Sequence, residues 1–172
     1  MPLSTKENKK PTMDLMKKNN LRRILELGVG YGVFGPKIKI ELPGSFLVGI
    51  EIFKPYWDKI PTRCYSLLFN EDIRLFDYKK FNDEYHMQCI LMIDVLEHLE
   101  RKDGIELLKK LEDIGFFIIV SVPIVDIEQG PFLGNEWEAH KTQWKQHELE
   151  ALGYKSEFIG DWVGVFYKDT RK

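Results

Sequence analysis

The sequence predicts an α/β protein built on an open, mostly parallel sheet with helices on both faces. Short apolar runs alternate with segments of helical periodicity, and the runs 88–94 and 116–122 are apolar almost throughout, as in strands buried on both faces. Glycines gather directly after the first run, at a predicted strand-to-helix turn. Near the end, Gly160-Asp161 joins two β-favouring runs as a hairpin, so the last strand must be antiparallel to its neighbour.

The individual elements follow from apolar spacing and from turn residues. The predicted strands cover residues 22–27, 46–52, 66–69, 88–94, 116–122, 154–159 and 162–168. The predicted helices cover residues 33–42, 54–60, 97–113 and a segment capped by Thr142 and ended by Gly153. The connection after the fifth strand is about twenty residues without clear periodicity, which is longer than a strand-to-helix link needs.

Length and composition place the chain among ordinary globular proteins. It has 172 residues, of which 44% are hydrophobic and 30% charged, so a single domain is expected and general disorder is excluded. No apolar stretch is long enough for a membrane span, and the N-terminus has no signal-peptide core. Cys64 and Cys89 lie in apolar surroundings and are predicted to be reduced thiols. These features predict a cytoplasmic protein.

Charge is unevenly distributed along the chain. Residues 1–23 contain seven Lys or Arg against Glu7 and Asp14, whereas the remainder is net acidic. We therefore divide the chain into a basic N-terminal extension, residues 1–20, and one domain, residues 21–172. The acidic body argues against a broad nucleic-acid footprint. The basic segment could touch a phosphate backbone, but a solvated, frayed end is the favoured interpretation.

The glycine cluster and four carboxylates are predicted to meet at one edge of the sheet. The cluster is Gly28, Gly30 and Gly32, and glycines at such a turn let a ligand approach the backbone. The carboxyl ends of parallel strands form the ligand-binding edge of open α/β sheets. Four acidic residues lie at predicted strand ends: Glu26, Glu51, Asp72 and Asp94.

Charge selects between nucleotide cofactors at this edge. A dinucleotide carries an anionic pyrophosphate, which a ring of carboxylates would repel, and Val33 stands where the dinucleotide glycine pattern needs a third glycine. S-adenosylmethionine carries a sulfonium and an ammonium group against one carboxylate. Acidic residues around it are therefore favourable, and S-adenosyl-L-methionine is the predicted cofactor.

Four motifs, in order, resemble those of class I S-adenosylmethionine-dependent methyltransferases. They are Ile24-Leu-Glu-Leu-Gly-Val-Gly-Tyr-Gly, Val48-Gly-Ile-Glu-Ile, Asn70-Glu-Asp-Ile73 and Ile93-Asp-Val-Leu-Glu-His-Leu99. The resemblance covers about residues 22–168. It implies a Rossmann-like, seven-stranded sheet with an antiparallel C-terminal strand.

The resemblance also implies a role for each motif position. Glu26 and the backbone of Gly28 and Gly30, in the loop that continues to Gly32, would hold the methionine part. Glu51 would bind the ribose hydroxyls, and Ile52 would cover one face of the adenine. Asp72 would accept the adenine amino group, and the Ile73 N–H would bond a ring nitrogen. Asp94 would line the pocket near the methionine end.

The methyl acceptor is less well specified, because in-line methyl transfer needs alignment and a dry site more than a fixed motif. The chain lacks the Asn/Asp-Pro-Pro-aromatic segment of enzymes that modify planar amines, which favours a small-molecule acceptor. We expect the acceptor beside residues 126–141, where Phe132 and Trp137 could exclude water. His140 and His98 are the candidate general bases. The spacing of Trp137, Glu138 and His140 does not indicate a metal site, and no metal is assigned.

Three functions remain open on the sequence alone. The first is a methyltransferase acting on a small molecule, with an acceptor site completed by the N-terminal segment or by another subunit. The second is a non-catalytic, methyltransferase-like subunit that binds a partner. The third, nucleic-acid methylation, depends mainly on the basic N-terminus. No membrane association is expected, and a homo-oligomer or a partner subunit is possible in each case.

Overall fold

A seven-stranded sheet forms the centre of the protein, in the strand order β3-β2-β1-β4-β5-β7-β6. The structure is a computed structural model that describes residues 5–171. The strands are β1 (Arg23–Leu27), β2 (Phe46–Ile50), β3 (Leu67–Phe69), β4 (Cys89–Ile93), β5 (Phe117–Pro123), β6 (Lys155–Ile159) and β7 (Val163–Asp169). Strands β1 to β5 pair in parallel, whereas β7 is antiparallel to both β5 and β6. The predicted fold class and the antiparallel final strand are confirmed.

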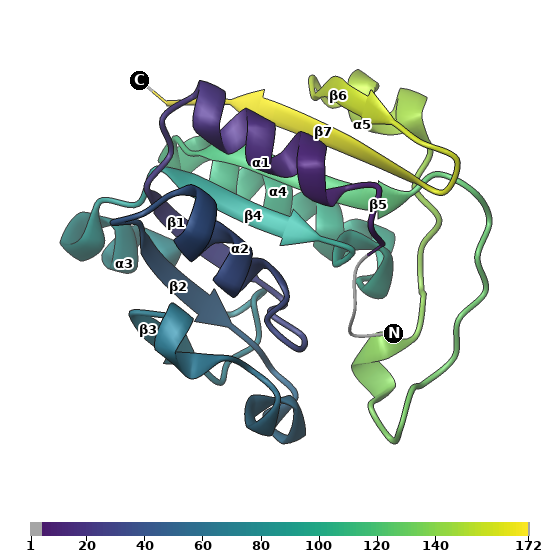
Figure 1. Ribbon diagram of the computed structural model, residues 1–172. Coiled ribbons are helices and arrows are strands. Elements are labelled where there is room, and N and C mark those ends of the chain that lie inside the picture. The colour runs from purple at the N-terminus through teal and green to yellow at the C-terminus, as the bar shows by residue number, and fades with distance from the viewer. Residues whose placement is uncertain (1–4, 172) are drawn as a thin grey trace.

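Helices cover both faces of this sheet (Figure 1). On one face lie α1 (Lys9–Lys18) and α2 (Phe34–Glu41), and α4 (Arg101–Ile114) lies behind the sheet with α3 (Tyr78–Tyr85). A short helix, α5 (Gln146–Ala151), precedes the final hairpin. Short 3-10 turns complete the structure: η1 (Lys54–Asp58), η2 (Thr62–Cys64), η3 (Leu96–His98) and η4 (Glu136–Glu138).

The strand sequences explain why the sheet has two apolar faces. In β1, Ile24 packs with α1 and α2, whereas Leu25 and Leu27 pack with α3 and α4 on the other face. Successive side chains point to opposite faces of a strand, so an uninterrupted apolar run supplies both cores. All residues of β4 and β5 are buried, as their sequence predicts.

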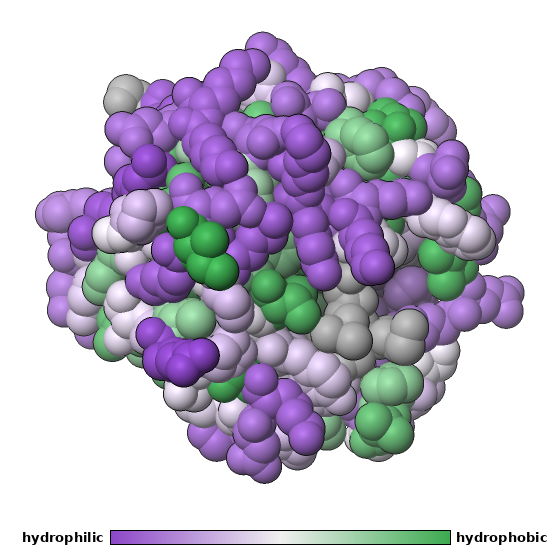
Figure 2. Space-filling view, viewed as in Figure 1, coloured by the Kyte–Doolittle hydropathy of each residue, from purple (hydrophilic) through white to green (hydrophobic). Residues whose placement is uncertain are grey.

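Helix α1 corrects the expectation of a frayed N-terminal end. Met13, Leu15 and Met16 are at most 1% exposed and belong to the same core cluster as Ile24. Apolar residues at 13 and 16 are three apart on one helix face, so their burial stabilises the helix against the sheet. The outer surface of this side of the molecule is mainly hydrophilic (Figure 2). Residues 1–4 lie outside the described part, and the domain boundary at residue 20 stays a prediction.

Several predicted element boundaries need correction. Thr142 does not cap the last helix, because its hydroxyl donates to the Leu99 carbonyl at 2.8 Å and the helix begins only at Gln146. The predicted helix 97–113 is divided into η3 and α4, and the predicted helix 54–60 is the 3-10 turn η1.

Cys64 and Cys89 are buried free thiols, as expected. No helix among residues 5–171 has the length and apolarity needed to cross a membrane.

Candidate active site

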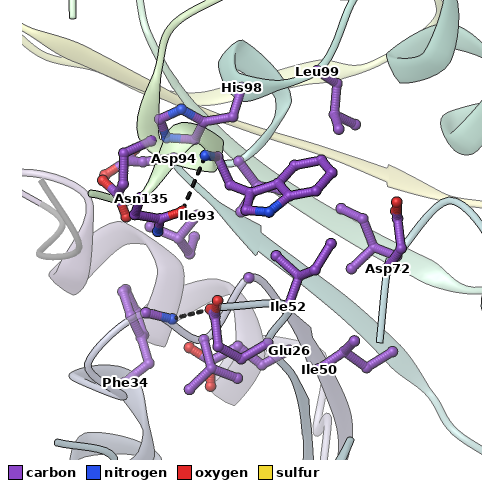
Figure 3. Close-up of a pocket in the computed structure, with 18 of the residues that line it drawn as sticks. Glu26, Phe34, Ile50, Ile52, Asp72, Ile93, Asp94, His98, Leu99 and Asn135 are labelled. Atoms are coloured by element: carbon purple, nitrogen blue, oxygen red, sulfur yellow. Dashed lines mark hydrogen bonds between the residues drawn. The ribbon is translucent and has the colours of Figure 1, made fainter. Parts of the chain in front are cut away.

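A cavity opens at the carboxyl ends of the central strands, with about 880 Å³ of empty space including its mouth. It is lined by every predicted cofactor residue except Gly32, namely Glu26, Gly28, Gly30, Glu51, Ile52, Asp72, Ile73 and Asp94. In Figure 3, Ile50, Ile52 and Asp72 form one side of this cavity, and Asp94 and His98 lie across from them. The structure therefore brings together residues that are up to 112 positions apart in the sequence, from Glu26 to Glu138.

The glycine loop gives the cavity a floor of exposed backbone. Gly28 and Gly30 have φ values of +70° and +57°, in the left-handed region that glycine adopts without strain. A Cβ atom at Gly28 would lie 2.7 Å from a methyl group of Val95, so no side chain fits there. Gly32 lies where packing is close, because a Cβ there would meet Pro61 at 2.7 Å. It packs against the residues on either side of η2 and does not line the cavity.

Glu51 is held in place by two backbone N–H groups. It is 5% exposed, and its two carboxylate oxygens accept hydrogen bonds from Gly30 N and Phe53 N, each at 2.8 Å. Burial raises the pKa of Glu51, and the nearby charge of Glu138 adds to the rise. Each carboxylate oxygen has a second lone pair, which is the arrangement needed to accept a pair of hydroxyls.

Glu26 lies beneath the same loop and is 4% exposed. The Tyr65 hydroxyl donates to its Oε2 at 2.8 Å. Burial raises the pKa of Glu26 to about 8, and the charge of Glu51 contributes. A cation beside Glu26 would stabilise its ionised form. Tyr65 was not identified from the sequence, because its contact with Glu26 is a tertiary one with no local pattern.

Asp72 borders the cavity but already has a cationic partner. The Arg74 guanidinium donates to both carboxylate oxygens of Asp72, with the closest approach at 2.5 Å, and also reaches Asp103 at 3.0 Å. Although burial alone would raise the pKa of Asp72, the hydrogen bonds from Arg74 lower it. Asp72 therefore stays ionised, and an adenine amino group would share this carboxylate with Arg74.

Asp94 follows β4 in a left-handed conformation, with φ at +56°. Its carboxylate accepts from the Ser121 hydroxyl at 3.0 Å and from the Asn8 amide at 3.3 Å. Burial raises the pKa of Asp94 to about 6. Asn8, which precedes α1, is fully buried, so the N-terminal segment contributes directly to this wall. Nothing in the sequence around Asn8 indicates this contact.

The long segment 126–141 lies on the rim where it was predicted. Its residues Asn135, Trp137 and Glu138 line the cavity together with Gly28 and Asp94. The Tyr56 hydroxyl donates to Glu138 Oε1 at 3.1 Å, which connects this segment to η1. Phe132 does not line the cavity, so its expected part in excluding water is wrong. Its backbone instead pairs with that of Asn135 in a tight turn.

The two candidate bases lie against each other at the far end of the cavity. His98 borders the cavity, whereas His140 does not, and their ring centroids are 5.0 Å apart. Burial lowers the pKa of His98 to about 4. Glu97 is 2% exposed, and one of its carboxylate oxygens lies within 4.8 Å of a ring nitrogen of each histidine. Glu97 was not among the site residues predicted from the sequence. Its position next to His98, shortly after a predicted strand, could have indicated that it belongs to the site.

Solved structures of methyltransferases share this architecture at low sequence identity. The methyltransferase domain of the bacterial protein CtHen1 matches with a TM-score of 0.60 and 20% identity, covering 94% of this chain and 98% of that one. The N-terminal domain of EvdMO1 with S-adenosylhomocysteine bound has a TM-score of 0.68 and 13% identity, covering 95% and 80%. This chain has the class I methyltransferase fold.

The small RNA methyltransferase HEN1 has the same methyltransferase fold, with a TM-score of 0.67 and 15% identity. That match covers 98% of this chain and 27% of HEN1. No protein-family model and no curated protein sequence matches the chain. The class I resemblance seen in four sequence motifs is thus confirmed at the level of the fold.

Proposed function

We propose that this protein is a methyltransferase that uses S-adenosylmethionine. The observation that carries the proposal is a cavity at the strand ends in which a bare glycine backbone lies beside Glu26, Glu51 and Asp94. The pKa of each of these carboxyl groups is raised by burial. No Lys or Arg is among the cavity-lining residues of the described chain. Such a site favours a cationic ligand and disfavours a pyrophosphate.

The residues present fit this cofactor part by part. Glu26 and the loop backbone would hold the ammonium and carboxylate of the methionine part, and Glu51 would accept the ribose hydroxyls. Ile52 and Ile73 would border the adenine, with Asp72 as acceptor for its amino group. Asp94 would face the methionine end. The bound cofactor would supply an electrophilic methyl group.

The acceptor side of the cavity supports methyl transfer to a small molecule. Trp137 and Leu99 border it and would keep water from the reacting groups. Glu138, tied to Tyr56, would hold the segment 126–141 over the acceptor.

Methylation of RNA is a second candidate function. It is favoured by the likeness to a small RNA methyltransferase and by the lysines of α1, four of whose ten residues are Lys. The net charge of −2 speaks against a broad nucleic-acid surface. Binding to a short RNA that weakens steeply with salt would support this second candidate. A non-catalytic subunit is the third, and the retention of every motif carboxylate argues against it.

His98 and His140 remain the candidate bases for an acceptor that carries a proton. Only His98 borders the cavity, so it would make the direct contact. A base whose pKa is about 4 is weak near neutral pH, so an unaided His98 would act only on an acidic acceptor.

We further propose a cytoplasmic location, which suits two free, unpaired thiols.

Calorimetric titration with S-adenosylmethionine and with NAD tests the proposed cofactor. We expect saturable binding of S-adenosylmethionine at micromolar concentrations, with much weaker binding of NAD. Tighter binding of NAD would refute the proposed function. Transfer of a labelled methyl group to candidate small molecules or to RNA would then separate the acceptor classes.

A further inference from the structure

We propose that Glu97, His98 and His140 bind a divalent transition-metal ion at the wall of the cavity. Three potential ligand atoms, one from each side chain, lie within 4.8 Å of one another. They come from η3, which follows β4, and from the segment 126–141, three residues of which line the cavity. Binding of the ion does not depend on the proposed function, but its role there does.

The hydrogen bonds of both histidines leave one ring nitrogen of each free. His98 Nδ1 lies 3.3 Å from the Ala139 carbonyl, and His140 Nδ1 lies 2.8 Å from the Ile127 carbonyl. A carbonyl oxygen can only accept a hydrogen bond, so both Nδ1 atoms carry the proton. Each Nε2 then has an unshared electron pair. Metal-binding histidines are commonly oriented in this way, by donating the other ring N–H to a backbone carbonyl.

Glu97 supplies a second and independent indication. Its side chain is 2% exposed, and its Oε2 has no hydrogen-bond partner. A buried carboxylate oxygen without a partner is costly, and such groups are normally paired or coordinate a metal. Neither Lys nor Arg forms an ion pair with Glu97 in the described chain. A cation among these three side chains would satisfy this oxygen.

The donor set indicates the class of metal. Two imidazole nitrogens and one carboxylate oxygen suit Zn²⁺ and related transition-metal ions, whereas Mg²⁺ and Ca²⁺ prefer oxygen ligands throughout. Bonds of about 2.1 Å around a tetrahedral ion place the ligand atoms about 3.4 Å apart. The three side chains would therefore approach one another by roughly an ångström when the ion binds. His140 lies on a loop segment, which can accommodate such a shift.

Three protein ligands leave coordination positions open for another molecule. His98 borders the cavity between Asp94 and Leu99, so an acceptor beside it could place an oxygen on the ion. A bound cation lowers the pKa of a coordinated hydroxyl. This arrangement indicates an alcohol or a phenol as the acceptor. His98 and His140 would then act as metal ligands, and neither would need to act as the general base.

Metal titration of the full chain, freed of any affinity tag and treated with a chelator, tests this proposal. Co²⁺ is the probe, followed by its visible absorption, and calorimetry with Zn²⁺ gives the stoichiometry. We expect one ion per chain. His140→Ala and Glu97→Gln should each weaken binding at least tenfold, whereas His147→Ala, which alters an exposed histidine of α5, should not change it.

Two outcomes would overturn the metal site. One is a wild-type chain that binds neither ion at millimolar concentration, and the other is unchanged affinity in both site variants. Thermal melting verifies that each variant is folded. Calorimetry with S-adenosylhomocysteine distinguishes this proposal from the proposed function: loss of nucleoside binding with intact metal binding would refute the function alone.

Discussion

The cofactor side and the acceptor side of the cavity are built in different ways. On the cofactor side, Glu26, Gly28 and Glu51 lie at or directly after the ends of two neighbouring strands. On the acceptor side, Asn8, Glu97 and Glu138 come from separate elements that meet only through tertiary contacts. The first arrangement follows from the sheet itself, and the second follows from how loops pack over it.

Sheet register explains why the cofactor side is fixed. Leu27 pairs with Ile50 on one side and with Met92 on the other, so the residues after these strands share one edge. Parallel strands buried on both faces cannot slip in register without exposing a core face. Glu26, Glu51 and Asp94 are therefore held close together at this edge even though burial raises their pKa values.

The largest predicted effect concerns the pH dependence of stability on the cofactor side. A carboxyl group whose pKa is higher in the folded than in the unfolded state favours folding at low pH. For Glu26 this contribution is complete below about 4.5 and is lost as the pH rises to about 8. In that window Glu26 alone should lower the free energy of unfolding of the ligand-free protein by up to about 1.4 kcal/mol for each pH unit.

Denaturant unfolding at several pH values measures this dependence, with Glu26→Gln as the comparison. The variant should show a flatter profile and equal or greater stability at pH 8, but weaker cofactor binding. Identical profiles for the two proteins would show that Glu26 titrates normally.

The second prediction distinguishes the acceptor side from the cofactor side by comparing turnover with cofactor affinity. His140→Ala should lower turnover by about a hundredfold or more, because the acceptor side loses a group needed only for the reaction. Affinity for S-adenosylhomocysteine should stay within about twofold, because His140 does not line the cofactor part of the cavity. Steady-state kinetics and calorimetry on the same preparation measure both quantities. Full turnover in this variant would remove His140 from the mechanism.

The third prediction concerns Asn8, through which the N-terminal segment joins the acceptor side. Asn8→Ala removes hydrogen bonds to Asp94 and Ser121 in a buried position, which should cost about 1–3 kcal/mol in stability. Asp14→Ala, on the partly exposed side of α1, is the matched control and should change stability little. Urea unfolding compares the two variants. Equal stability of the two variants would mean that the hydrogen bonds of Asn8 do not stabilise the fold.

The same contrast shows how far sequence reasoning extends. The strands of the sheet, the antiparallel final strand and the cavity wall around Glu51 follow from apolar runs and from the residues that end them. The partners Tyr65, Arg74 and Asn8 could not be predicted, because each depends on the packing of segments with no shared pattern. Helix α1 was misjudged because its many lysines concealed the spacing of Met13 and Met16. Gly32 belongs to the predicted loop, but it packs against Pro61 and does not line the cavity.

The affinity of S-adenosylhomocysteine for Glu51→Ala, measured by calorimetry, tests the central claim most directly. We expect binding to weaken by about 1–3 kcal/mol, or roughly tenfold to a hundredfold, because buried ribose hydroxyls would lose a charged acceptor. Glu71→Ala, which alters an exposed neighbour of Asp72, should bind as the wild type does. Unchanged affinity in a folded Glu51→Ala protein would contradict the assignment of this cavity to the cofactor.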